Sequence, residues 1–115
     1  YDAALDYCVA NIADISICAG THNENSSMHL VNLMAQHGIA SNDRRVYFSQ
    51  LLGMSDNLSY NLSEAGYNVA KYVPYGPVKK VLPYLFRRAE ENTAIAGQMG
   101  RELSLIVAEQ SRRKG

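Results

Sequence analysis

The chain has 115 residues, 47% of them apolar, which is enough for one small domain with a buried core. Its 11 basic residues balance its 11 acidic residues, which argues against a nucleic-acid-binding or strongly membrane-binding surface. The two cysteines, Cys8 and Cys18, lack the spacing of metal ligands, and no metal site is predicted. We expect both to be buried free thiols in a reducing compartment.

Along the chain, amphipathic helical segments alternate with short apolar segments that are typical of buried strands. The expected helices and strands are, in order, helix 1–11, strand 14–20, helix 26–37, strand 45–51, helix 56–65, strand 68–73, helix 77–94 and helix 98–111. Gly38 and Gly66 should follow helix ends, and Asp56 is expected to cap a helix. Pro83 should interrupt its helix or restart it.

This alternation predicts an α/β fold with a parallel sheet and helical crossovers. The strands are apolar on both faces, as expected for a parallel sheet that is covered on both sides. Three strands are too few for a (β/α)8 barrel, which needs eight strands and roughly 250 residues. We therefore expect residues 1–115 to be a C-terminal piece of a larger domain, with a first strand whose free edge needs a partner.

Three polar clusters follow the ends of the predicted strands, where parallel α/β folds bind their ligands. They are 21–23, 53–56 and 72–76. His22 is either a structural residue or a functional one. Because His22 has no nucleophile partner at a telling spacing, its cluster suits cofactor binding better than acid–base catalysis.

A pair of adjacent arginines, Arg87 and Arg88, lies on the helix after the third strand. Tyr84, Arg88 and Glu91 share a helix face because they are spaced by four and three residues. Arginine presents a planar fork that fits a carboxylate, and phosphate is also possible. The alternative is a solvated helix face with a weak arginine–glutamate pair. Tyr72, at the end of the preceding strand, favours a small anion-binding pocket.

Four ordered motifs make the chain resemble the proline dehydrogenase family. They are Thr21-His-Asn23, Gln50-Leu-Leu-Gly-Met-Ser-Asp56, Lys71-Tyr-Val-Pro-Tyr-Gly-Pro77 and Leu82-Pro-Tyr-Leu-Phe-Arg-Arg-Ala-Glu-Glu-Asn92. The resemblance covers the chain from about residue 14 to residue 92. It implies a distorted (β/α)8 barrel that holds FAD, oxidises L-proline to 1-pyrroline-5-carboxylate and passes electrons to a membrane quinone.

The resemblance also implies roles for particular residues. They are the proline carboxylate clamp for Arg87 and Arg88, the walls of the substrate pocket for Tyr72, Tyr84 and Leu51, FAD contacts for Thr21, His22 and Asn23, and ordering of the arginines for Glu91. The family's upstream substrate lysine has no counterpart in this chain. We therefore expect the isolated chain neither to bind FAD nor to turn over proline without the remainder of the barrel.

Two other functions stay open from the sequence. One is a hydroxyproline dehydrogenase, for which Tyr72 is the residue to compare, because pocket residues near the substrate ring decide between the two substrates. The other is a non-enzymatic α/β module that binds an anion through the arginine pair. The residues of the motifs, together with residues 97–98 and 101–104, resemble those of bacterial, single-function members of the family. This resemblance implies the bacterial cytoplasm, peripheral at the inner membrane, with the matrix side of the mitochondrial inner membrane as the alternative. The basic tail 112–114 could touch anionic lipid, although a solvated tail is favoured.

Overall fold

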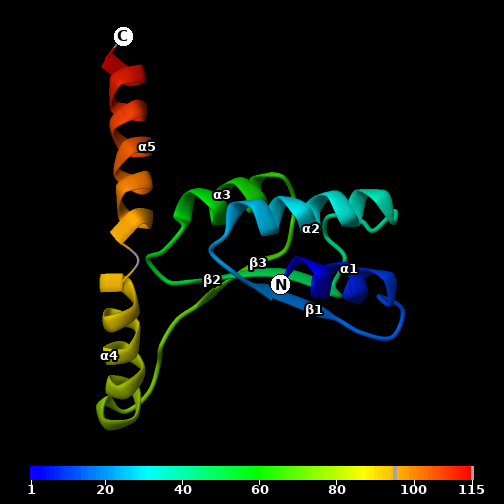
Figure 1. Cartoon of the computed structure of the whole chain (residues 1–115), viewed down its shortest axis with the longest axis horizontal. Helices are drawn as coiled ribbons and strands as arrows, with labels where there is room; N and C mark the ends of the chain where they lie inside the picture. The colour runs from blue at the N-terminus through cyan, green and yellow to red at the C-terminus, as the bar shows by residue number, and fades with distance from the viewer. Residues whose placement is uncertain (95, 115) are drawn as a thin grey trace. The chain divides into compact units, whose positions relative to one another are not determined.

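The computed structural model describes the backbone of residues 1–94 and 96–114, and the side chains of residues 1–91, 100 and 103–114. The elements run α1 (Asp2–Ala10), β1 (Ile17–Gly20), α2 (Glu24–Gln36), β2 (Val46–Leu51), α3 (Asp56–Glu64), β3 (Val69–Tyr72), α4 (Val78–Ala94) and α5 (Ala96–Lys114) (Figure 1). The chain divides into two compact units, Tyr1–Tyr72 and Val73–Gly115. The predicted α/β alternation is confirmed, and each predicted strand contains the observed one.

The first unit is built on a parallel sheet with the strand order β1-β2-β3. Cys18 pairs with Tyr47 in the register of β1 and β2, and Leu51 pairs with Tyr72 in that of β2 and β3. Because β1 and β3 each have one strand neighbour among the described residues, the sheet is not closed. This matches the expectation of an incomplete barrel.

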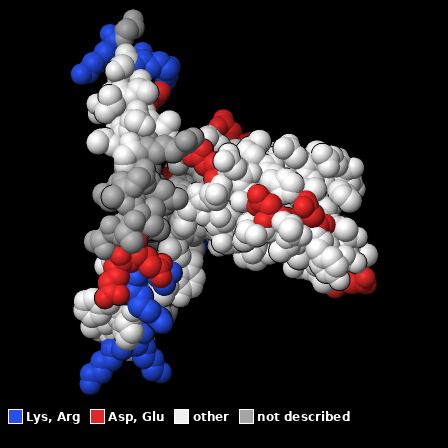
Figure 2. All heavy atoms as spheres, in the orientation of Figure 1, with Lys and Arg blue, Asp and Glu red and all other residues white. Residues whose placement is uncertain are grey.

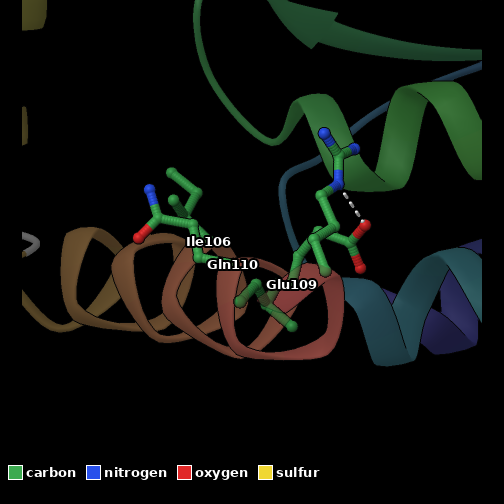
Figure 3. A pocket seen from close by; sticks show the side chains of 5 residues that line it. Ile106, Glu109 and Gln110 are labelled. Carbon is green, nitrogen blue, oxygen red and sulfur yellow. Dashed lines mark hydrogen bonds and ion pairs between the residues drawn. The ribbon is translucent and has the colours of Figure 1, made fainter. Parts of the chain in front are cut away.

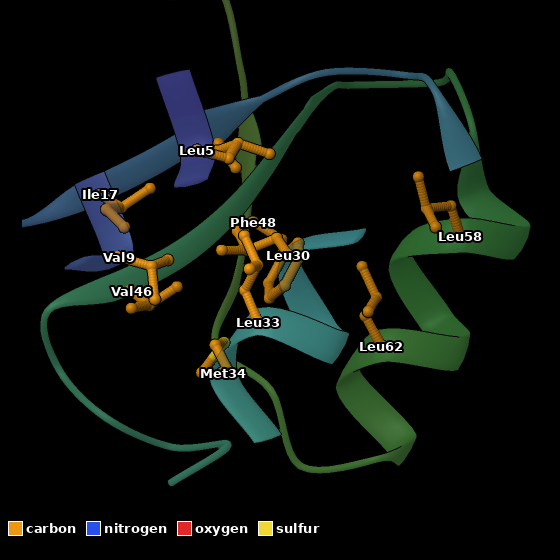
Figure 4. Close-up of a cluster of buried hydrophobic side chains, with 11 residues drawn as sticks. Leu5, Val9, Ile17, Leu30, Leu33, Met34, Val46, Phe48, Leu58 and Leu62 are labelled. Carbon is orange, nitrogen blue, oxygen red and sulfur yellow. The ribbon is translucent and has the colours of Figure 1, made fainter. Parts of the chain in front are cut away.

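The hydrophobic core lies on one face of this sheet, between the sheet and α1, α2 and α3 (Figure 4). Its buried side chains are Leu5, Val9, Ile17, Ala19, Leu30, Leu33, Met34, Val46, Phe48, Leu58 and Leu62. Phe48 is fully buried in the central strand, and its ring meets that of Tyr67 edge to face at a centroid distance of 5.6 Å. The three helices therefore depend on β2 for their packing surface.

The opposite face, which we call the uncovered sheet face, is not covered by α1, α2 or α3, the helices of the first unit. It carries Cys18, Gly20, Tyr47, Ser49, Leu51, Ala70 and Tyr72, which alternate with the core-facing residues. Within the first unit the sheet is therefore covered on one face only, whereas the sequence predicted cover on both faces. The prediction for the cysteines is half wrong for the same reason: both are free, but Cys18 is exposed on this face while Cys8 is half-buried.

Two glycines end helices as predicted. Gly38 (φ 65°) follows α2 and Gly66 (φ 87°) follows α3, both in the left-handed region that glycine adopts without steric cost. The amides of Gly38 and Ile39 donate to the carbonyls of Ala35 and Met34, at 3.3 and 2.8 Å, and the same pattern closes α3. This pairing satisfies carbonyls that the helix end would otherwise leave without partners.

Two local predictions are wrong. Asp56 does not cap α3, because Ser55 is the N-cap residue and the Asp56 carboxylate instead pairs with Lys71 at 2.8 Å. Pro83 does not interrupt its helix, since α4 runs through it from Val78 to Ala94. Proline leaves one carbonyl, that of Lys79, without its helical donor. Because Lys79 is exposed, water can bind that carbonyl.

The second unit consists of α4 and α5, which is longer than predicted at both ends. Arg112 and Arg113 both donate to Glu109, at distances of 2.6 to 2.8 Å, and these pairs extend the last turns of α5. Basic side chains at that end also complement the helix dipole. Among the described helices, none is long and apolar enough to span a membrane. Residues 97–98 and 101–102, on which the resemblance to bacterial members partly rests, lie outside the described side chains.

We predict that Phe48→Ala lowers the free energy of unfolding by about 3–5 kcal/mol, because it opens a cavity under all three helices. Tyr60→Ala is the matched control, since Tyr60 is exposed on α3 and its loss should change stability by less than about 0.5 kcal/mol. Urea unfolding followed by circular dichroism measures both. Equal midpoints for the two variants would contradict the central place of Phe48.

A charged turn leads into β2. The Asp43 carboxylate accepts hydrogen bonds from the backbone N–H of Arg45 at 2.9 Å and from its guanidinium at 2.6 and 3.0 Å. Asn68 Nδ2, just before β3, donates to the Asp43 carbonyl at 2.8 Å. The turn therefore ties the starts of two strands together. The hydrogen bonds from Arg45 lower the pKa of Asp43 to about 2.

We predict a pH dependence of stability from Asp43. Its folded-state pKa lies below its unfolded-state pKa of about 4. The stabilisation is therefore complete above pH 4 and is lost as the pH falls toward 2. The difference in urea midpoint between the parent chain and Asp43→Asn should shrink over that range, while the exposed Asp14→Asn should show no such change. A difference that stays constant from pH 6 to pH 2 would contradict this assignment.

Candidate active-site residues

The first candidate site lies where the three strands end. The amide of Thr21, after β1, donates to the carbonyl of Ser49 at 3.2 Å, and that of Leu52, after β2, donates to the carbonyl of Tyr72 at 3.0 Å. Two of the predicted polar clusters, 21–23 and 53–56, are thereby brought to the same edge of the sheet. The expected place for a ligand site in a parallel α/β fold is this carboxyl edge.

Thr21 and Asn23 shape the loop between β1 and α2. The Asn23 side chain caps α2 by accepting from the backbone N–H groups of Asn25 and Ser26, at 2.9 and 3.2 Å. Thr21 Oγ1 accepts a hydrogen bond from the backbone N–H of Asn23 at 3.0 Å. Both side-chain oxygens therefore have structural partners already, and the predicted FAD contacts of these residues stay a prediction.

His22, half-buried between them, is held by a serine from the next loop. Its Nδ1 lies 2.9 Å from the hydroxyl of Ser55, and the direction of this hydrogen bond depends on the tautomer. Ser55 is buried and adopts a left-handed backbone conformation, with φ 51° and ψ 44°. That conformation costs a non-glycine residue about 1–2 kcal/mol. Sequence reasoning did not single out Ser55, because its role depends on a contact 33 residues away.

A buried polar pair lies beneath this contact. Gln50 is only 2% exposed, and its Oε1 accepts from the Ser59 hydroxyl at 2.9 Å. Its Nε2 donates to the Thr21 carbonyl at 3.4 Å, which links β2 to the loop after β1. Neither Gln50 nor Ser59 was predicted as a site residue. The signal was available, since Gln50 shares the strand parity of Val46 and Phe48 and a polar side chain on that face needs partners.

Lys71 fixes the same edge from β3. Its ammonium donates to the carbonyl of Met54 at 2.6 Å and to the carboxylate of Asp56 at 2.8 Å. The loops after β1 and β2 are thus each held by a side chain from the end of the next strand, Gln50 of β2 and Lys71 of β3. Lys71 was part of a motif in the sequence but had no assigned role. The sequence did contain a signal, because Lys71 is on the face of β3 that the helices cover, where a charged side chain needs partners.

Two of the predicted pocket residues are neighbours on the uncovered sheet face. Leu51 and Tyr72 are register partners in β2 and β3. Leu51 is half-buried, whereas Tyr72 is 51% exposed. Register partners in a parallel sheet point to the same side, so these two side chains can line one wall.

The remaining predicted residues belong to the second unit and lie on α4. Arg88 Nη2 donates to Glu91 at 2.6 Å, and the Arg88 guanidinium carbon lies 5.3 Å from the centre of the Tyr84 ring. Arg88 is half-buried, and its Nε is shielded from solvent without a hydrogen-bond partner among the described residues. Arg87 is exposed beside this cluster. Figure 2 shows basic and acidic side chains together on α4.

The described part of α5 carries a groove, but it offers no converging polar groups (Figure 3). Its lining consists of Leu105, Ile106, Glu109, Gln110 and Arg113. All of these come from one helix, and the two charged groups already pair with each other at 2.8 Å. The strand ends and the α4 cluster are therefore the stronger candidates.

Comparison with known proteins identifies the chain's relatives. Residues 1–101 match the family model described as proline dehydrogenase. Over 98% of its length the chain is 44% identical to proline dehydrogenase 1, mitochondrial, of Homo sapiens and 43% identical to the Bos taurus protein of that name. Over 97% it is 43% identical to a hydroxyproline dehydrogenase of Xenopus laevis.

These matches cover 19%, 20% and 24% of the respective relatives, so the chain spans about a fifth to a quarter of their length. Residues 1–101 include the strand-end loops, with their Ser55–His22 contact, and the Tyr84–Arg88–Glu91 cluster of α4. The chain belongs to the proline dehydrogenase family.

Proposed function

We propose that the chain supplies the substrate clamp and part of the flavin site of an FAD-dependent enzyme. The enzyme oxidises L-proline to 1-pyrroline-5-carboxylate, in proline catabolism, and passes the electrons to a quinone. The observation that carries this proposal is the half-buried Arg88, held between Tyr84 and Glu91 within the matched region. An arginine that is fixed by an aromatic ring and a carboxylate is preorganised to bind an anion.

We further propose that residues 1–115 are a C-terminal part of a (β/α)8 barrel. Two edge strands and an uncovered sheet face support this, because a closed barrel pairs its edges and fills its interior. The remainder of the barrel is then the partner of this chain. It would also supply the parts of the site for which residues 1–115 have no counterpart.

Proline would be bound through its carboxylate by Arg88 and Arg87. Two adjacent helix residues diverge by about 100° around the axis, so the two guanidinium groups approach one anion from neighbouring sides. Glu91 orders Arg88 through the 2.6 Å hydrogen bond. The family resemblance also assigns Leu51 and Tyr72, which are register partners in β2 and β3, to the substrate pocket. The clamp contributes orientation, which is a large catalytic factor for a bound substrate.

The residues at the carboxyl edge fit a flavin. Gly20 and Ser49, register partners on the uncovered sheet face, are small, and a Cβ at Gly20 would meet no atom within 4 Å. This leaves space for a flat ring system beside Thr21, His22 and Asn23, which bring polar groups to its edge. When bound, FAD supplies the electron-accepting chemistry of the reaction. The protein then needs to bind and orient its substrate rather than to provide an acid–base pair.

Hydroxyproline is the second candidate substrate. The Xenopus laevis relative, which is 43% identical, is named a hydroxyproline dehydrogenase. Tyr72 is the residue to compare, because an additional ring hydroxyl needs either space or a hydrogen-bond partner in the pocket. The proline reading is preferred because the family model and the two mammalian relatives carry that name.

Location and membrane contact are part of the same proposal. The names of the mammalian relatives support the mitochondrial alternative for location, while the bacterial cytoplasm stays a prediction. To transfer electrons to a membrane quinone, the enzyme would have to contact the membrane surface. Arg112 and Arg113 both pair with Glu109, which lowers the positive charge that the tail could offer to anionic lipid. This supports a solvated tail.

We predict that Arg88→Met in the complete polypeptide lowers kcat/KM for proline roughly 100-fold, mainly through KM, because a charged partner of the substrate carboxylate is lost. Arg88→Lys should fall between, since it keeps the charge without the fork. Lys79→Met is the control, because it removes a positive charge from an exposed position of the same helix. Steady-state kinetics with a dye acceptor measure all three. A parent-like KM in Arg88→Met would contradict the clamp.

We predict that the complete polypeptide binds FAD and has a higher kcat/KM on L-proline than on trans-4-hydroxyproline. The isolated 115-residue chain should be colourless and inactive, because it holds less than half of a barrel. Flavin absorbance and dye reduction test both statements. A preference for hydroxyproline would favour the second candidate, and a yellow, active chain of 115 residues would contradict the partial-site proposal.

A further inference from the structure

We propose that Ser55 is a positioning residue that fixes the ring of His22 for binding of the flavin cofactor. This inference rests on the proposed function, since it concerns the same site. It starts from the short loop between β2 and α3, in which Ser55 adopts a left-handed conformation and its hydroxyl lies 2.9 Å from His22 Nδ1.

Ser55 is in a position where its side chain would be expected to cap a helix, but it does not do so. Ser55 is the N-cap residue of α3, and serine at this position normally accepts a hydrogen bond from the helix backbone. In α3 as described, its side chain makes no such bond. The backbone is also in the region that glycine would occupy without steric cost. A serine with a strained backbone and no capping hydrogen bond suggests that its hydroxyl has a different role.

The surrounding contacts hold the loop in this conformation from both sides. Lys71 donates to the carbonyl of Met54 at 2.6 Å, on one side of Ser55. The Ser59 hydroxyl lies 3.1 Å from the carbonyl of Ser55 itself and 2.9 Å from the buried Gln50. These contacts come from β2, β3 and α3, so the strained conformation is fixed by three elements. The Ser55 hydroxyl is thereby held in one place.

A hydroxyl fixed at Nδ1 sets two properties of His22. It stops the ring from turning about χ2, and it couples the tautomer of the ring to the direction of the hydrogen bond. When Ser55 donates to Nδ1, Nε2 carries the proton and acts as a donor. Because His22 belongs to the loop proposed to contact FAD, a fixed ring lowers the entropy lost on cofactor binding.

The test uses three substitutions at Ser55 in the complete polypeptide. Ser55→Gly removes the hydroxyl and relieves the backbone strain, Ser55→Ala removes the hydroxyl and keeps the strain, and Ser55→Asn keeps a polar side chain that tolerates the left-handed region. Ser63→Ala is the control, since it deletes an exposed hydroxyl from α3. The readouts are the Kd for FAD, the visible spectrum of the bound flavin and the unfolding midpoint of the apoprotein.

We expect Ser55→Gly and Ser55→Ala to raise the Kd for FAD about tenfold, as loss of one hydrogen bond in a binding site does. The apoprotein of Ser55→Gly should be at least as stable as the parent, so the loss cannot be assigned to unfolding. In a His22→Ala background, Ser55→Gly should change the Kd less than twofold, because the hydroxyl then has no ring to orient. Ser55→Asn should restore part of the affinity.

Two results would overturn the inference. One is parent-like FAD affinity in Ser55→Gly, and the other is an equal loss with and without His22. Either would assign Ser55 to the loop alone and leave the proposed function intact. A parent polypeptide that neither binds FAD nor oxidises proline would instead overturn the proposed function, and this inference with it.

Discussion

The alternation of side chains along β2 determines both the core and the candidate site. Val46, Phe48 and Gln50 face the helices, while Tyr47 and Leu51 face the other way. The first two bury apolar surface under α1, α2 and α3, which is the main driving force for folding of the first unit. Because the period of a strand is two residues, a slip by one position would exchange the two faces and destroy both.

Gln50 connects the buried core to the loops of the candidate site. It lies on the covered face at the end of β2, where its amide needs partners that the apolar core cannot supply. It finds them in Ser59 of α3 and in the Thr21 carbonyl after β1. The loops that carry His22 and Ser55 are thus attached to the most buried strand. Such attachment gives the carboxyl edge a defined geometry before any ligand binds.

The sequence predicted the elements well and the contacts between them poorly. Periodicity located the strands and helices because it depends on local spacing, and Gly38 and Gly66 marked two helix ends for a steric reason. The motifs also predicted roles for particular residues, and those roles stay a prediction. The Ser55–His22 and Lys71–Asp56 pairs were missed because each joins residues far apart in sequence. Similarly, the uncovered sheet face could not be foreseen from strands that look apolar throughout.

The charge of the α4 cluster explains why the proposed clamp needs two arginines. Arg88 is already paired with Glu91 at 2.6 Å, so this pair taken by itself is close to neutral. A carboxylate that approached Arg88 alone would meet the charge of Glu91 as well. Arg87 adds a second positive charge beside this pair, which offsets the charge of Glu91. In this arrangement Glu91 orients Arg88, and Arg87 restores the attraction that the orientation removes.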